Sequence, residues 1–90
     1  MIYYTREEIL EAKNIIGKIT ASLPSYMWFR FEKMKCNNYD TLVVLNQDTE
    51  IFNKFDGIIP DTHKYNDSVS RAVALCKFFN KEMPKWLGEQ

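Results

Sequence analysis

Two segments of this 90-residue sequence repeat apolar residues at alternating spacings of three and four positions. This period places the apolar side chains on one face of an α-helix, which needs another apolar surface to cover. The first segment contains Ile9, Ala12, Ile16, Ile19 and Leu23. The second contains Val69, Ala72, Cys76, Phe79 and Met83. The chain is therefore expected to pack two amphipathic helices, one near each end, onto a shared core.

The first helix is expected to run from about residue 6 to about residue 22. Thr5 and Glu8 have the spacing of a capping box, in which the hydroxyl and the carboxylate each bind a free amide of the first turn. Pro24 should end the segment because proline cannot continue a helix. This part of the sequence makes the clearest structural prediction.

The second helix is expected to begin near residues 66–68, since Asn66, Asp67 and Ser68 all favour the N-cap position. Pro84 should stop it. The tail beyond Pro84 carries one large aromatic residue, Trp86. That side chain must either pack back onto the fold or contact a partner.

Between the helices, residues 26–35 and 41–45 are rich in aromatic and β-branched residues and are joined by an Asn/Asp-rich connection. This pattern predicts an antiparallel hairpin. In the first strand the odd positions should be buried and the even positions half-exposed. The odd set is Met27, Phe29 and Phe31, and the even set is Trp28, Arg30 and Glu32. The second strand is apolar on both faces and should be central.

The sequence of residues 47–65 fits two alternative secondary structures. One interpretation is a short capped helix ending at Gly57. The other, which we favour, is a third strand that turns at Asp56–Gly57 into Ile58–Ile59, because Asp-Gly is a strong hairpin signal. The predicted fold is one α+β domain over residues 1–90. It has a small antiparallel sheet of two to four strands flanked by two amphipathic helices, in the order α-β-β-(β)-α.

The composition narrows the classes of function. Twelve basic and twelve acidic residues cancel, which argues against a general nucleic-acid coat. No apolar run approaches the roughly 18–20 residues of a membrane span, and the start of the sequence does not have the pattern of a signal peptide. We therefore expect a cytoplasmic protein in which Cys36 and Cys76 are reduced thiols. The abundance of Lys, Asn, Ile and Tyr is typical of AT-rich genomes and suggests a bacterium or its phage.

Motifs for catalysis are weak. Asp56, Asp61, His63 and Asp67 lie close in sequence, but His63 is the only histidine and the spacing fits no zinc or calcium site. No serine or cysteine near it has the context of an activated nucleophile. The three glycines form no phosphate loop. We expect no enzyme, no cofactor and no bound metal.

Nucleic-acid binding is the second class considered. The predicted element order resembles that of double-stranded-RNA-binding domains. Members of that family begin their final helix with lysines, whereas residues 66–70 here are acidic or uncharged. The resemblance therefore covers element order and no motif. Arg30, Lys33 and Lys35 alternate with aromatic residues in the first strand, which fits either a base-stacking platform or an ordinary amphipathic strand.

The surface of the second helix suggests a contact site. On a helical wheel Phe78 falls near Arg71, away from the apolar stripe and on the side that also carries Lys81. An exposed Phe beside basic side chains is typical of a contact with an acidic or aromatic partner. The alternative is that residues 47–65, or the tail with Trp86, cover Phe78.

The first helix has a similar feature, since Leu10, Gly17 and Ala21 form an uncharged strip away from the core stripe. Glycine inside a helix costs about 1 kcal/mol relative to alanine, so close approach of another element at Gly17 is a reasonable hypothesis. That element would be the chain's own tail or a second subunit. We therefore predict a homodimer or a complex with a partner. The expected contact residues are Phe78, Arg71, Lys81, Trp86, Leu10 and Gly17.

Three hypotheses for function follow. The first is a small non-enzymatic binding or regulatory protein, such as a phage- or mobile-element-encoded inhibitor, that acts by protein–protein contact. The second is nucleic-acid binding through the first strand and the basic side of the second helix. The third is capture of a small molecule such as a nucleotide between subunits, with the loop of residues 60–67 and Tyr65 as a wall.

Overall fold

The computed structural model describes residues 1–33, 39–46, 52–79 and 83–88. It has the predicted α+β architecture and adds a short helix at the end. The elements are α1 (Arg6–Ala21), β1 (Met27–Lys33), β2 (Asp40–Asn46), β3 (Phe52–Asp56), α2 (Asp67–Phe79) and α3 (Lys85–Gly88). In the ranges described, no helix combines the length and the apolar character needed to cross a membrane.

Helix α1 begins as its sequence predicts. The Thr5 amide donates to the Glu8 carboxylate at 2.8 Å, and the Glu8 amide donates to the Thr5 hydroxyl at 3.1 Å. These two bonds form the capping box and satisfy two amides that the helix itself leaves free. At the other end the Ser22 amide donates to the carbonyl of Ile19 at 3.1 Å. The predicted first helix is therefore confirmed to within one residue at its end.

The three strands form an antiparallel sheet in the order β1-β2-β3, so β2 is central as predicted. The register aligns Phe31 with Leu42 and Leu42 with Phe55. Strand β3 confirms the strand interpretation over residues 52–56 and contradicts a helix there. The predicted turn at Asp56–Gly57 is wrong: the Gly57 amide donates to the Asp40 carbonyl at 2.9 Å, which extends the β2–β3 pairing before the chain leaves the sheet.

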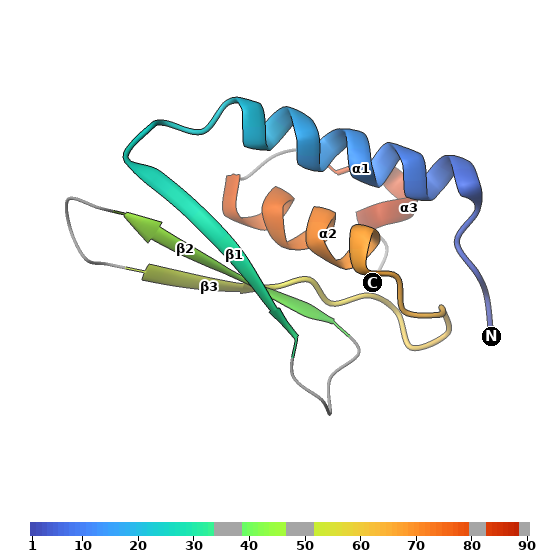
Figure 1. Cartoon of the computed structure of the whole chain (residues 1–90). Coiled ribbons are helices and arrows are strands. Elements are labelled where there is room, and N and C mark those ends of the chain that lie inside the picture. The colour runs from blue at the N-terminus through green and yellow to red at the C-terminus, as the bar shows by residue number, and fades with distance from the viewer. Residues whose placement is uncertain (34–38, 47–51, 80–82, 89–90) are drawn as a thin grey trace.

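Helix α2 occupies the middle of the molecule, between α1 and the sheet (Figure 1). Eight of its residues from Ser68 to Cys76 are buried, and only Arg71 in that stretch is partly exposed. A helix enclosed in this way is apolar on more than one face. The surplus apolar surface of α2 is thus used inside the fold, by α1 on one side and by the sheet on the other.

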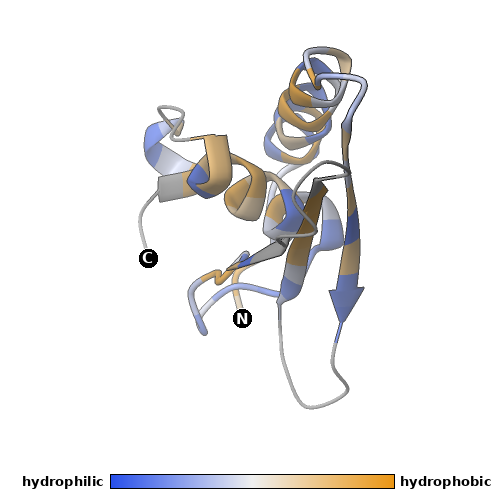
Figure 2. Ribbon diagram, turned by 90° about the vertical axis from the view of Figure 1, so that its left-hand side faces the viewer, coloured by the Kyte–Doolittle hydropathy of each residue, from blue (hydrophilic) through white to orange (hydrophobic). Residues whose placement is uncertain are grey.

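Both long helices lie on the same side of the sheet (Figure 1). The alternation in β1 decides which face they cover, and Figure 2 shows apolar and polar positions alternating along that strand. The covered face carries the odd residues of β1 together with Leu42, Val44 and Phe55, which pack with Ala74 and Leu75 of α2. The alternation is as predicted, but each side is more open than expected: the even residues of β1 are exposed and its apolar odd residues half-buried.

A second apolar cluster joins the two ends of the chain. Ala12 of α1, Val73 of α2 and Leu87 of α3 are buried in it, and Tyr4 and Trp86 pack against its edge. Cys76 is also buried there, whereas Cys36 lies outside the described residues. The short helix α3 was not predicted from sequence. It closes the core on the side of α2 that the sheet does not reach.

Candidate binding surface

Phe78 is not the exposed side chain that the helical wheel predicts. Its ring lies 5.2 Å from that of Phe55 in β3 and 4.5 Å from that of Phe79, measured between ring centroids. All three rings pack against the cluster under the sheet. The alternative interpretation of the sequence, that the segment of residues 47–65 covers Phe78, is therefore correct, and the covering residue is Phe55.

The basic side of α2 is also engaged within the fold. Arg71 pairs with Asp40, with 3.0 Å between the Arg71 Nε and the Asp40 Oδ2, and its guanidinium lies 5.1 Å from the Phe31 ring. The Lys77 ammonium donates to the carbonyl of Asp56 at 2.9 Å. Lys81 lies outside the described residues. Arg71 and Lys77 therefore hold α2 to the sheet.

Trp86 packs back onto the fold. Its indole N–H donates to the Glu11 carboxylate of α1 at 3.0 Å, and its ring lies 6.0 Å from that of Tyr4. The next residue, Leu87, is buried in the core.

The two positions on α1 that the sequence predicts as contacts, Leu10 and Gly17, remain exposed. Leu10 is 58% exposed, and a Cβ added at Gly17 would meet no atom of the described chain within 4 Å. The tail thus makes no close approach to Gly17.

Among the described residues, the most buried charged one is Asp40, to which sequence analysis gave no role. Asp40 is 1% exposed, and its carboxylate accepts from the Tyr65 hydroxyl at 2.8 Å and from Arg71. The Asp40 amide donates to the Ser70 hydroxyl at 2.7 Å, which in turn donates to the carbonyl of Gly57 at 2.7 Å. This Asp40 cluster ties β2, α2 and the loop before α2 together. Tyr65, Ser70 and Arg71 lie 25 to 31 positions from Asp40 in the sequence, so no local motif could have revealed the cluster.

The interactions of the Asp40 cluster stabilise the fold. Burial, followed by the hydrogen bond to Asp40, raises the pKa of the Tyr65 phenol well above its ordinary value of 10.0. Both carboxylate oxygens of Asp40 have partners, and no buried polar side-chain atom of the described residues lacks one. A carboxylate so enclosed cannot reach a substrate. The cluster therefore fixes the fold and is not a candidate catalytic centre.

The acidic loop near His63 forms no metal site in the described part of the chain. The His63 imidazole instead stacks on the Tyr4 ring, with 4.7 Å between the centroids and 22° between the planes. The Ile2 amide donates to the carbonyl of Thr62 at 2.8 Å, and the Lys64 amide donates to the carbonyl of Ile2 at 2.7 Å. These contacts attach the N-terminal segment to the loop.

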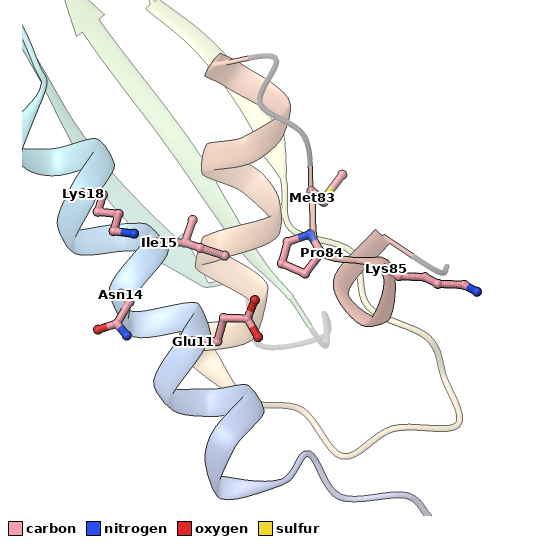
Figure 3. A pocket seen from close by; sticks show the side chains of 7 residues that line it. All are labelled: Glu11, Asn14, Ile15, Lys18, Met83, Pro84 and Lys85. Carbon is pink, nitrogen blue, oxygen red and sulfur yellow. The ribbon is translucent and has the colours of Figure 1, made fainter.

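A groove of about 560 Å³ lies between α1 and the segment that leads into α3 (Figure 3). Ile15, Met83 and Pro84 form its apolar part. Figure 3 shows Lys85 pointing away from the groove and Glu11 turned toward α3. Glu11 is the only carboxylate among the lining residues described, and it already accepts from Trp86. The described lining residues thus include no pair of groups suited to catalysis.

The face of the sheet turned away from the helices is the clearest open surface, and we call it the open face. Three rows of aligned residues cross it from β1 to β3. The first row begins with Trp28 and Leu45, the second is Arg30–Val43–Lys54, and the third is Glu32–Thr41–Asp56. The face therefore changes from apolar through basic to acidic along the strands.

Trp28 dominates the open face because it is 46% exposed on a surface that no described helix covers. Val43 beside it is buried between its cross-strand neighbours Arg30 and Lys54. Arg30 contacts Glu32 at 3.1 Å, whereas Lys54 has no ion pair within the described residues. The sequence placed Trp28 correctly on the outward side of its strand, but nothing in it indicated that both helices would leave this side uncovered.

The basic residues proposed for nucleic-acid binding do not come together. Arg30 points to the open face, whereas Lys33 lies on the covered side, where its ammonium is 4.0 Å from the centroid of the Tyr65 ring. Lys35 lies outside the described residues. No observation of this structure favours a nucleic-acid interface over a protein contact.

Comparison with known proteins adds no constraint. No family model, no curated protein and no solved structure matches this chain. The fold and the surfaces described above therefore carry the functional argument alone.

Proposed function

We propose that this chain is a small non-enzymatic binding protein that acts in the cytoplasm through protein–protein contact at the open face. The observation that carries the proposal is the exposed Trp28 on an uncovered sheet surface. Tryptophan is enriched among the residues that dominate binding energy, since it combines a large apolar area with few rotatable bonds. A regulator or inhibitor encoded by a phage or mobile element is the kind of protein we have in mind.

The surroundings of Trp28 support this proposal. Leu45 lies opposite it in β2 and provides apolar area, while Arg30 and Lys54 flank the buried Val43. An apolar anchor bordered by charged residues is a common arrangement in a protein interface. The charges then select the partner and its orientation more than they add affinity. This places the contact on a different surface from the one predicted on α2.

The order of the rows also supports the homodimer version of this proposal. Suppose that the open faces of two copies meet, related by a twofold axis that runs parallel to the rows, between the second and the third. Arg30 and Lys54 of one copy would then lie against the acidic row of the other. That acidic row contains Glu32 and Asp56. Opposed charges of this kind suit an isologous interface, in which each copy offers the same patch.

Site-specific photocrosslinking tests the proposal because it captures the protein that contacts a chosen position. A photoreactive phenylalanine analogue replaces Trp28 in one variant and Leu10 in a matched control, because both side chains are exposed and they lie on different elements. Irradiation in the source cells should give a defined protein adduct from position 28 and none from position 10. An adduct with a second copy of the chain identifies the homodimer.

The affinity of the captured partner then measures the contribution of Trp28. Trp28→Thr should weaken binding by about 30-fold or more, since hot-spot residues contribute about 2 kcal/mol or more. Leu10→Thr is the control and should change affinity less than about twofold. Unchanged binding by Trp28→Thr, with the fold intact by circular dichroism, would contradict the proposal.

A further inference from the structure

A second feature lies apart from the open face, where the N-terminal segment, the end of β1 and the loop before α2 meet. A hollow of about 280 Å³ is found there. It is lined by Met1, Lys33, His63, Lys64 and Tyr65. These residues come from three separate stretches of the chain, so only the folded protein brings them together.

The lining of this hollow is basic. It contains the ammonium groups of Lys33 and Lys64 and the imidazole of His63, and no carboxylate is among the lining residues described. Within the described part of the chain, neither lysine takes part in an ion pair. The nearest buried carboxylate, Asp40, lies behind Tyr65 and is neutralised by Arg71. The two lysine charges are therefore available to a ligand.

The walls of the hollow are held in place by contacts to the rest of the fold. Tyr65 is fixed by its hydrogen bond to Asp40, and the Lys33 ammonium is held 4.0 Å from the centroid of the Tyr65 ring. The backbone of Lys64 is bonded to Ile2, and the ring of His63 is stacked on that of Tyr4. Groups held in this way lose little freedom when a ligand binds, which favours affinity.

We propose that this hollow binds the phosphate group of a small molecule. Lysine ammonium groups bind phosphate as point charges, and two unpaired lysines beside an imidazole match a doubly charged anion. Its volume is below the roughly 300–1,000 Å³ typical of sites that enclose a whole drug-sized ligand. The site therefore holds the phosphate itself and leaves the remainder of the molecule in solvent.

Amide chemical shifts measure this binding directly. The ¹⁵N-labelled protein is titrated with inorganic phosphate and, separately, with glycerol 3-phosphate, each against sodium chloride at equal ionic strength. Saturable shifts are expected at Lys33 and at residues 62–65. Equal affinity for the two ligands is expected, because the phosphate group alone is held and the rest of the molecule stays in solvent. An affinity at least about tenfold higher for the ester would show that its organic part also contacts the protein, which contradicts a site for the phosphate alone.

Lys33→Gln and Lys64→Gln should each weaken binding by about tenfold or more, because each removes one charge-assisted contact. Lys13→Gln, at an exposed position of α1, is the matched control and should leave the affinity unchanged. Thermal unfolding of each variant verifies that the fold is retained. Shifts that do not saturate, or that persist unchanged in the Lys33→Gln Lys64→Gln double variant, would overturn the proposal. Because the hollow does not include Trp28, this result is independent of the proposed protein contact.

Discussion

The two faces of the three-stranded sheet are built from the same strands but have different surroundings. On the covered face, Phe31, Leu42 and Phe55 are aligned under α2 and contribute to the core. On the open face, the adjacent row is Arg30–Val43–Lys54, and the sheet meets no described helix. The covered face also ends in the Asp40 cluster, in which every buried polar side-chain atom has a partner. The open face ends in a half-exposed tryptophan.

This difference separates residues that maintain the fold from residues that are free to bind. A buried polar group without a partner costs stability, so the covered side must satisfy all of its hydrogen bonds internally. An exposed aromatic ring has no such requirement, and its removal should have little effect on folding. Substitutions on the two faces should therefore separate the two roles, and the following predictions are ordered by the size of the expected effect.

The largest effect is expected at Gly57, where the backbone of the loop after β3 touches α2. A Cβ added there would overlap the backbone carbonyl oxygen of Ser70, which cannot move without displacing the helix. Gly57→Ala should therefore lower the free energy of unfolding by about 3 kcal/mol or more, measured by urea denaturation.

Gly17→Ala is the matched control for this substitution. A Cβ there meets nothing within 4 Å, so the change should stabilise the protein by about 0.5–1 kcal/mol through the higher helix propensity of alanine. A Gly57→Ala variant as stable as wild type would contradict the close contact between Gly57 and Ser70.

An intermediate effect is expected from Tyr65→Phe in the Asp40 cluster. The loss of one hydrogen bond to a buried carboxylate should cost about 1–2 kcal/mol near neutral pH. The pKa of the Tyr65 phenol is raised in the folded protein, mainly by burial, so folding favours the neutral phenol. This contribution is fully present below the unfolded pKa of 10.0 and is lost as the pH rises above it.

The stability of the wild-type protein should therefore fall more steeply above pH 10 than that of Tyr65→Phe. Urea denaturation between pH 8 and pH 11 measures both slopes. Parallel slopes would show that the pKa of the Tyr65 phenol is not raised in the folded protein.

The smallest effect on stability is expected from Trp28→Thr on the open face. Threonine suits a strand and the indole is half-exposed, so the loss should be under about 1 kcal/mol. Phe29→Thr, one position along on the covered face, should cost about 2–3 kcal/mol because its ring packs in the core. Thermal unfolding of the two variants compares the faces directly. Equal losses would show that the open face is covered in solution.

Several elements could be predicted from sequence because their signals are local. The capping box at Thr5 and Glu8 located the start of α1, and the alternation from Met27 to Glu32 identified both the strand and its inward side. Strand β3 was predicted correctly, but the turn after it was not. The Asp-Gly signal fits a hairpin in isolation, whereas here the Gly57 amide is bonded to Asp40 and its Cα lies against Ser70.

The surfaces could be predicted only in part. A helical wheel shows which residues share a side of α2 but not how many sides are covered. The wheel therefore predicts Phe78 and Arg71 as contact residues, although Phe55 and Asp40 hold them within the fold. The wheel places Leu10 away from the core stripe of α1, and it is exposed there; its contact with a partner stays a prediction.

The amino-acid sequence by itself determined where the helices and strands lie and which side of each strand is apolar, since periodicity and capping act between residues a few positions apart. Only the tertiary structure decided that α2 is enclosed, that the Asp40 cluster forms, and that Trp28 and the hollow beside Lys33 face solvent. Those features depend on contacts between residues distant in the chain, such as Asp40 and Arg71, and on both helices packing against one face of the sheet. The surfaces proposed for binding are what that packing leaves uncovered.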